Sequence, residues 1–424
     1  MLMIRPLLGV ALALIVADVA WADGEAQGDG QRRSRAGFRD EVGLGPTSVE
    51  AALVEGDRVT KPLFTLRAFD RALQPYFRWK GRINRRHGLM FGADYQALYQ
   101  RVDQSPGEDE AAGGIFRVYG EWALLNRCRP CHQGSLVFKV EHRHTLGTTV
   151  APQDLGAQFG YGGATGSLFS DLGLALTNFF WKQRFGSRNQ GVVIFGQIDP
   201  LDYVDVAGIG NPFTAWQNLS VLVNPTIPIP NQGLAAAASW MFDSHWYAVA
   251  GFSDANALPT RDFTQTWQGF ETFKHAEFGW TGGREHFFRQ NVHLTVWHQD
   301  DREDAGTPEA WGWAVSGSSP LGGGWSAAVR AGWSSAAVGF AERHAGFLLE
   351  RSFNREADAI GLGVGWDDVW GAVREDQLSA ELFLRAQLAQ SFAVTPSLQY
   401  IRNPAFNAND DEAWVFSIRV RLVL

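Results

Sequence analysis

Residues 414–424, WVFSIRVRLVL, alternate between apolar side chains and side chains that are mostly polar or charged. Successive side chains of a β-strand point to opposite faces, so Phe416 and Ile418 share one face while Arg419 and Arg421 share the other. The length matters as well, because a tilted strand that crosses a bilayer needs about 9–11 residues. The segment therefore predicts a membrane-spanning strand with one oily and one hydrated face.

The same two-sided pattern recurs along most of the chain. Residues 135–145, SLVFKVEHRHT, and residues 377–388 also set apolar side chains opposite charged ones. Short turns such as 188–190 alternate with long segments such as 148–170, which is typical of transmembrane barrels. We therefore predict an all-β fold: a transmembrane, antiparallel, up-and-down β-barrel of about sixteen strands with a short N-terminal extension. The expected strand starts are residues 87, 115, 135, 172, 191, 234, 245, 271, 291, 310, 324, 345, 359, 377, 394 and 413.

Composition narrows the alternatives. The 424 residues carry a net charge of −8, which argues against a nucleic-acid-binding surface. A mean hydropathy of −0.16 excludes a polytopic helical membrane protein. A secreted soluble β protein stays open, because sandwich strands can also be one-sided. Aromatic residues near strand ends favour an interfacial girdle of a barrel; the expected members are Trp122, Trp297, Trp311, Trp313, Trp325, Trp333, Trp366 and Trp414.

The N-terminal residues differ from the rest. Residues 1–22 combine Arg5, an apolar run and a small-residue site at residues 20–22, which predicts a secretory signal peptide; an anchor helix is the alternative. Residues 23–85 are expected to be a polar segment, partly helical or disordered, with a short helix at 63–74. Residues 86–424 are expected to form the barrel.

The C-terminal stretch also carries a family resemblance. TPSLQYIRNP at residues 395–404, followed by VFSIRVR at 415–421, resembles the end of the bacterial carbohydrate-selective porin family. The resemblance implies an outer-membrane barrel of Gram-negative bacteria that lets glucose-like sugars diffuse passively into the periplasm, and no enzyme activity. A general diffusion porin for small polar solutes is the alternative. We expect sugars, outer-membrane lipids and the barrel-assembly machinery as partners, no nucleic acid, and a monomer or homotrimer.

Charged residues on the predicted inner faces are candidate substrate-lining groups. They carry both signs, which suits a neutral polyol because such groups donate and accept hydrogen bonds without a net field. The alternative is a wall whose charges only pair with each other. The candidates are Asp94, Arg117, Glu121, Lys139, Glu141, Arg143, Glu381, Arg385, Arg419 and Arg421. The glycines at 361, 363 and 365 are interpreted as small lumen-facing residues of a strand.

The long segment 201–232 is the candidate constriction loop, because a loop of this length in a compact domain is usually functional. Tyr203, Phe213 and Trp216 are expected to offer rings on which sugars stack, and Asp202 and Asp205 to accept hydrogen bonds. The alternative is an ordinary external loop that never folds inward.

A short motif, Cys128-Arg129-Pro130-Cys131-His132, has the spacing of a c-type haem attachment site. In an oxidising compartment, a Cys128–Cys131 disulfide is the simpler interpretation. Haem at Cys128, Cys131 and His132, a redox thiol pair and a metal stay as alternatives. Otherwise we expect no cofactor, no metal and no catalytic residues.

Overall fold

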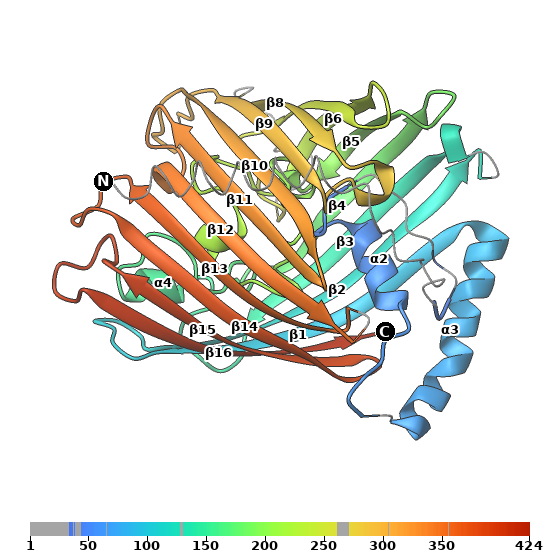
Figure 1. Ribbon diagram of the computed structural model, residues 1–424, viewed down its shortest axis with the longest axis horizontal. Helices are drawn as coiled ribbons and strands as arrows, with labels where there is room; N and C mark the ends of the chain where they lie inside the picture. The colour runs from blue at the N-terminus through green and yellow to red at the C-terminus, as the bar shows by residue number, and fades with distance from the viewer. Residues whose placement is uncertain are drawn as a thin grey trace.

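The computed structural model describes residues 34–36, 38, 44–64, 66–127, 130–260, 271–303, 305–354 and 356–424; the predicted signal peptide lies outside this part of the chain. Sixteen antiparallel strands close into one barrel (Figure 1). Each strand pairs with its neighbours in sequence, and β1 pairs with β16 to close the ring. The predicted fold class is confirmed, and the predicted strand starts lie within five residues of those observed.

The strands alternate in direction around the barrel, as consecutive hairpins require. Their bounds are β1 Leu89–Val102, β2 Glu110–Leu125, β3 Gly134–Thr145, β4 Gly173–Phe185, β5 Gly191–Ile198, β6 Gly233–Met241, β7 Trp246–Asp254, β8 Thr272–Thr281, β9 Asn291–Gln299, β10 Ala310–Gly322, β11 Trp325–Ser334, β12 Ala341–Phe353, β13 Asp358–Val369, β14 Gln377–Ala389, β15 Phe392–Arg402 and β16 Glu412–Val423.

The described helices lie at the ends of the barrel or within it. They are α2 Val49–Asp57, α3 Arg67–His87, α4 Leu155–Gln158, α5 Leu219–Leu222 and the 3-10 turns η1 Pro130–His132, η2 Pro200–Asp202 and η5 Arg284–His286. None of these helices has the length and apolarity to cross a bilayer. The expected helix at 63–74 is replaced by α3, which starts later and continues past Pro75.

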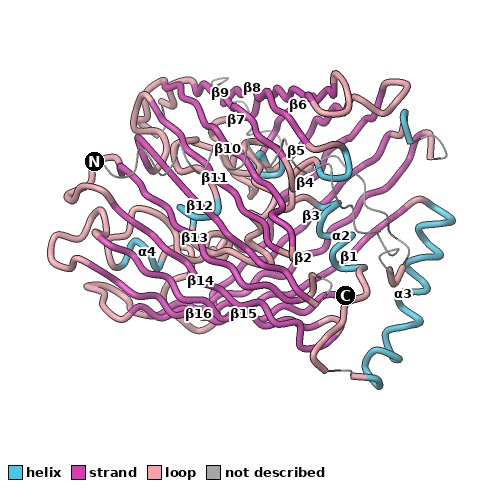
Figure 2. The backbone as a smooth tube through the Cα atoms, in the orientation of Figure 1, coloured by secondary structure: helices cyan, strands magenta, loops and turns pink. Residues whose placement is uncertain are grey.

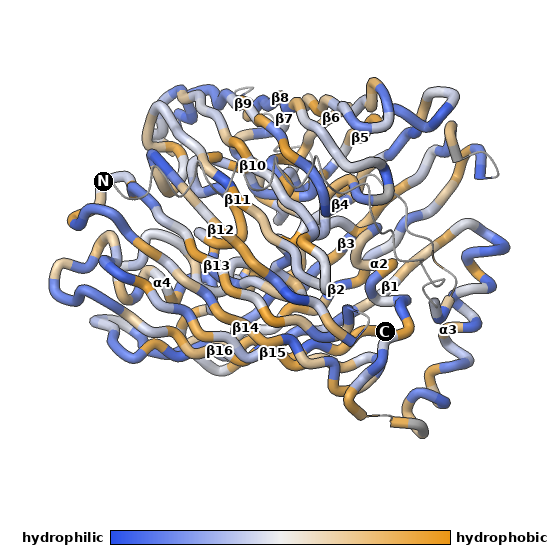
Figure 3. The backbone as a smooth tube through the Cα atoms, in the orientation of Figure 1, coloured by the Kyte–Doolittle hydropathy of each residue, from blue (hydrophilic) through white to orange (hydrophobic). Residues whose placement is uncertain are grey.

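Alternation of exposure along each strand is the property that defines the two surfaces. In β16, Phe416 and Ile418 are 57% and 47% exposed. Arg419, the residue after Ile418, points to the other face and is 1% exposed. Figure 3 shows the same change from hydrophobic to hydrophilic along the strands. Leu382 of β14 also points outward. The apolar side chains therefore cover the outside of the barrel, where lipid would lie, and the polar ones fill its interior.

Most of the expected aromatic girdle is on the outer surface. Trp122, Trp311 and Trp414 are well exposed there. Trp297 is an exception, because its position in β9 turns it inward, where it is 3% exposed and stacks with Phe273. The expectation for Trp297 was wrong: alternation along the strand fixes the face on which the residue lies, whatever its type.

The two ends of the barrel differ in their connections. One end carries short links, such as residues 242–245 and 390–391, and the other carries long ones, such as residues 146–172 and 199–232. Both α2 and α3 lie at the short-turn end, whereas α4 lies at the long-loop end (Figures 1 and 2). These two ends are called below the short-turn end, which carries α2 and α3, and the long-loop end.

Gly88 joins α3 to the barrel. Its φ of +72° is the left-handed conformation that glycine adopts freely, and its N–H donates to the carbonyl of Asn84 to end the helix. A Cβ at this position would lie 2.9 Å from the carbonyl oxygen of Ala123. The residue therefore permits both the helix end and the close approach of the first hairpin.

Placing a charge on the outer face tests the orientation of the strands. Leu382 lies near the middle of β14, so Leu382→Arg should lower the free energy of unfolding by about 2–4 kcal/mol in a bilayer. Urea unfolding of the barrel in lipid vesicles measures this loss. Leu382→Met is the matched control and should cost less than about 1.5 kcal/mol. Equal stability of the Arg variant and the control would contradict a lipid-facing Leu382.

Candidate functional site

All ten sequence-predicted lining residues belong to strands, and their side chains project into the barrel interior. Nine of them are buried, and Arg385 keeps 16% of its side chain exposed. Eight of them belong to ionic clusters, whereas Glu381 and Arg419 bind the backbone of the long loop. Whether any of them contacts a substrate stays a prediction.

Asp94 is the centre of the first cluster. Arg117 lies directly opposite it on β2, and its Nε donates to Asp94 Oδ1 at 2.7 Å. Arg421 lies on β16, the other neighbour of β1, and its Nη2 donates to Asp94 Oδ2 at 3.0 Å. The closure of the barrel thus brings together residues 94 and 421, which are far apart in sequence. Because the closing strand adjoins the first, the sequence predicted that both Arg419 and Arg421 lie near Asp94. This is confirmed for Arg421. It was wrong for Arg419, which lies opposite Leu98 and binds the long loop instead.

Glu141 is the centre of a second cluster on β3. It accepts from Arg143 Nε at 2.8 Å and lies 3.8 Å from Lys139 Nζ. These side chains are two positions apart on one strand, so they share the inner face. Lys139 also lies 3.9 Å from Asp199, at the point where the long loop leaves β5. The cluster therefore links the barrel wall to that loop.

Lys182 of β4 connects the wall to the N-terminal segment. Its Nζ lies 2.6 Å from Glu121 on β2 and 2.6 Å from Glu50 on α2. The Ser48 side chain caps α2 by accepting from the Ala51 N–H. The cap fixes where α2 begins and hence which of its turns presents Glu50 to Lys182.

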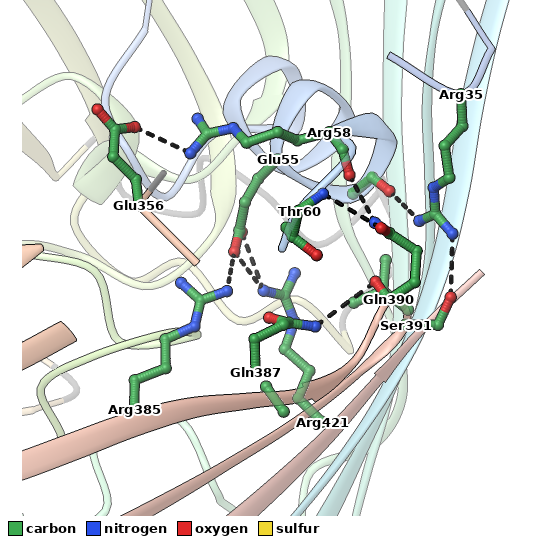
Figure 4. Close-up of a pocket in the computed structure, with 13 residues that line it drawn as sticks. Arg35, Glu55, Arg58, Thr60, Glu356, Arg385, Gln387, Gln390, Ser391 and Arg421 are labelled. Carbon is green, nitrogen blue, oxygen red and sulfur yellow. Dashed lines mark hydrogen bonds and ion pairs between the residues drawn. The ribbon is translucent and has the colours of Figure 1, made fainter. Parts of the chain in front are cut away.

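Glu55 fixes the other end of α2 to the wall (Figure 4). Arg421 donates to both of its carboxylate oxygens at 2.9 Å, and Arg385 donates at 2.8 Å. Burial alone would raise the pKa of Glu55, but the charges of Arg421 and Arg385 outweigh it and lower the pKa to about 2. The carboxylate is therefore ionised at neutral pH, and α2 is held in the short-turn mouth by ion pairs at both ends.

The long loop 201–232 folds into the barrel. Glu381 of β14 accepts from the backbone N–H groups of Gln217 and Asn218 at 2.9–3.0 Å. Arg419 of β16 donates to the carbonyls of Pro212 at 2.5 Å and Ala215 at 2.9 Å. Two predicted lining residues thus hold loop backbone, which satisfies polar groups that would otherwise be buried alone.

Glycines on β13 make room for this loop. A Cβ at Gly363 would lie 2.3 Å from Val221 of α5, and one at Gly361 would lie 2.8 Å from the Trp216 ring. The interpretation of these glycines as small inward-facing residues is confirmed. Their function is to let the loop approach the wall without side chains between them.

The predicted loop residues occupy different environments. Phe213 lies under the guanidinium of Arg117, whose Cζ is 3.5 Å from the ring centroid. Trp216 is fully buried against Phe383, with centroids 4.7 Å apart, so its ring faces the wall in this conformation. Tyr203 and Phe213 are likewise buried, each 6% exposed. Of the three predicted aromatic platforms, Phe213 is the one that lies beside the Asp94 cluster.

The two predicted loop carboxylates make internal contacts. Asp205 accepts from Ser316 at 2.7 Å and lies 3.2 Å from His293 Nε2. Asp202 accepts from the Thr47 hydroxyl at 2.7 Å and the Asn178 amide at 3.2 Å. Burial raises the pKa of Asp202 to about 7, with Asp199 adding to the rise and Lys139 opposing it.

The loop and the N-terminal segment meet inside the barrel. The Gly45 N–H donates to the carbonyl of Asp202 at 2.7 Å, and Asn211 donates to the carbonyl of Pro46 at 3.1 Å. A cavity of about 80 Å³ remains beside this contact. Its lining includes Pro46, Arg143, Asp205, Phe213, Asn224 and Arg330. The two segments enter from opposite ends and meet in the lumen.

Sequence reasoning did not identify the N-terminal contacts. Glu50 and Glu55 were assigned only to a polar segment, yet both complete ionic clusters of the wall. Ser48 followed by a short run of helix formers was the available signal, because it matches a capped helix. Nothing in the sequence showed that this helix lies inside the barrel.

The Cys motif is only partly visible. Cys128 and Arg129 lie outside the described residues, so the Cys128–Cys131 disulfide and the haem alternative stay predictions. Residues 130–132 form η1, in the connection between β2 and β3 at the short-turn end. In the described part of the chain, no group of three or more metal-ligating side chains gathers at one place.

Removing the charge of Glu55 should weaken the retention of α2. Glu55→Gln keeps the shape of the side chain but loses its ion pairs with Arg385 and Arg421, which at a partly exposed site should raise the open probability about fivefold. Planar-bilayer recording of single channels measures this change. Glu108→Gln, on an exposed loop at the opposite end, is the control. Unchanged gating in Glu55→Gln would contradict a clamping role.

The opposite pKa shifts of Glu55 and Asp202 predict a pH range in which α2 and the long loop are held most firmly inside the barrel. Because the pKa of Glu55 is lowered, its stabilisation is present above about pH 4.5 and is lost as the pH falls toward 2. Because the pKa of Asp202 is raised, its contribution is present below about pH 3.8 and is lost as the pH rises through 7. Conductance should therefore be lowest near about pH 4, where both contributions are largely retained, and should rise toward pH 2 and toward pH 7.

Single substitutions distinguish the rise in conductance at acidic pH from the rise at higher pH. Asp202→Asn should remove the rise between about pH 4 and pH 7 and leave the acidic rise, and Glu55→Gln should do the reverse. Conductance measured from pH 3 to pH 8 tests both expectations. A flat profile in the unmodified protein would contradict the linkage.

Comparisons with known proteins agree with this architecture. Residues 312–424 match the family model of the carbohydrate-selective porin, OprB family. Among curated proteins, none matches the chain significantly. A solved structure of Pseudomonas putida OprB is similar with a TM-score of 0.66 and 14% identity, over 82% of this chain and 97% of that one. A mutant of the Rh. blastica porin is similar with a TM-score of 0.50 and 10% identity, over 79% of this chain and 100% of that one.

At these identities the structural matches show a shared fold, and the family model supplies the sequence evidence. The matched region includes the segments 395–404 and 415–421 from which the resemblance was inferred. The resemblance is therefore confirmed: the chain has the barrel fold of porins, and its residues 312–424 carry the sequence pattern of the carbohydrate-selective porin, OprB family.

Proposed function

We propose that this chain is an outer-membrane porin that lets neutral, glucose-like sugars diffuse into the periplasm. The observation that carries the proposal is the interior cluster of Asp94, Arg117, Arg421 and Phe213. It combines hydrogen-bond acceptors, hydrogen-bond donors and an aromatic ring within one section of the barrel. The match of residues 312–424 to carbohydrate-selective porins supports the same substrate class.

The chemistry of the cluster suits a sugar. A sugar presents hydroxyl groups at its edge and C–H groups on its faces. The guanidinium of Arg117 holds its donors in a fixed fork, which matches neighbouring hydroxyls, and the ring of Phe213 offers an apolar surface for the C–H face. Opposite charges lie beside each other, so a neutral solute meets polar partners without a strong net field.

Access to this cluster depends on α2. The helix lies within the short-turn mouth, bound to Arg385 and Arg421 through Glu55 and to Lys182 through Glu50. A solute that crosses the barrel needs room at this mouth. We therefore propose that α2 is a plug, and that permeation accompanies its displacement. Since Arg421 contacts both Asp94 and Glu55, release of the plug also frees donors of the sugar-binding cluster.

A general diffusion porin is the second candidate. It is favoured by the way in which the wall charges already pair, as between Glu141 and Arg143. Such pairs give a polar wall without requiring recognition of any solute. The two candidates differ in one measurable property, which is whether a particular sugar lowers the ion current.

Sugar titrations of the ion current distinguish the two candidates. In planar bilayers, added glucose should lower the conductance in a saturable manner if the cluster binds sugars. Phe213→Ala should raise the half-blocking concentration by about three- to tenfold, because an aromatic contact contributes about 0.5–1.5 kcal/mol. Phe416→Ala, on the outer face, is the matched control and should leave the half-blocking concentration unchanged. A current that is insensitive to all sugars tested would favour general diffusion.

A further inference from the structure

Helix α3 lies outside the barrel at its short-turn end (Figure 1). Its sequence, RAFDRALQPYFRWKGRINRRH, carries seven Arg and Lys side chains and one acidic residue, Asp70. A helix of this length measures about 31 Å. The helix is therefore strongly basic, although the whole chain has a net charge of −8.

The charges and the apolar side chains of α3 lie on opposite faces. At 100° per residue, Phe69, Leu73, Tyr76 and Ile83 fall on one side, and the arginines fall on the other. The arginine face includes Arg71, Arg78, Arg82 and Arg85. Strong amphipathicity, low overall hydrophobicity and aromatic residues on the apolar face are the properties of a helix that lies in a membrane interface.

Part of the apolar face packs on the protein. Phe77 is 4% exposed and lies beneath the Arg35 guanidinium, 3.7 Å from its Cζ to the ring centroid. Lys80 is also buried and lies 3.3 Å from the backbone carbonyl oxygen of Leu424. These contacts hold the C-terminal half of α3 against the end of the barrel.

Two large apolar side chains of α3 are exposed. Phe69 is 40% exposed and Trp79 is 45% exposed. The Trp79 ring contacts Phe91 of β1 edge to face, with centroids 5.3 Å apart. Phe91 belongs to the outward-facing set of β1, so the apolar face of α3 continues the lipid-facing surface of the barrel.

The segment before α3 extends this surface. The backbone N–H groups of Leu63 and Phe64 donate to the carbonyls of Gln387 and Leu388 at the end of β14. Their side chains are 57% and 62% exposed. The chain thus leaves the lumen at β14, and α3 runs from there to β1, so apolar side chains lie along one stretch of the rim.

We propose that α3, together with Leu63, Phe64 and Leu66, forms a docking surface for the anionic phospholipid leaflet on the short-turn side of the membrane. The exposed aromatic side chains enter the boundary between headgroups and acyl chains, and the arginines bind phosphate headgroups. Charge complementarity favours an anionic partner. The apolar face of α3 is continuous with the lipid-facing wall, and this favours a bilayer over an acidic protein. The inference requires that the barrel spans a bilayer but not that it passes sugars.

Hydrogen–deuterium exchange of the full chain in vesicles tests this proposal. Peptides that cover residues 66–79 should exchange about tenfold more slowly in vesicles with 30% phosphatidylglycerol than in pure phosphatidylcholine. The double variant Arg78→Gln/Arg82→Gln should lose this lipid dependence. Arg188→Gln, an exposed arginine in the short β4–β5 turn at the same end, is the matched control and should keep it.

The outcomes are distinguishable from failure of the barrel or of sugar transport. Heat-modifiable migration on gels shows whether each variant is folded in the vesicle, and sugar block of the current is measured separately. Phe69→Ser should speed exchange in both lipids if the apolar face is inserted. Equal exchange in the two lipids, or lipid dependence that survives in Arg78→Gln/Arg82→Gln, would overturn the proposal.

Discussion

The need to pair every backbone N–H and C=O group inside hydrocarbon determines the rest of this structure. A sheet can meet that need in a bilayer only by closing on itself, and the pairing of β1 with β16 is the step that closes it here. Closure forces one side of every strand outward and the other inward. It also places residues from the two ends of the barrel sequence, such as Asp94 and Arg421, in contact.

The interior solves a second problem, which is how to bury many charges. Lone buried charges are costly, so each one must find a partner or a backbone group. Asp94 and Glu141 pair with arginines of the wall, whereas Arg419 and Glu381 bind the backbone of the inward loop. The same ionic groups that make the lumen polar therefore also fix the segments that fill it. In the function that we propose, selectivity and occlusion depend on shared side chains, because Arg421 contacts both Asp94 and Glu55.

Sequence reasoning succeeded where a repeating physical rule applied. The period-two alternation predicted the sixteen strands and the inward side of residues such as Arg117, because burial alternates strictly along a strand. It failed for Trp297, where residue type was given more weight than strand phase. It could not show that loop 201–232 folds inward or that α2 enters the mouth. Both depend on contacts between distant segments, such as Asp202 with Thr47, which no local pattern encodes.

The order of the N-terminal elements has a mechanical consequence. Only nine residues, 58–66, separate α2 from α3, and a fully extended chain of that length reaches about 30 Å. If α3 stays attached beside β1, a displaced α2 remains tethered within that distance of the opening. The helix can then leave the mouth, but its local concentration there stays high. Reclosing is therefore a unimolecular event that needs no external partner.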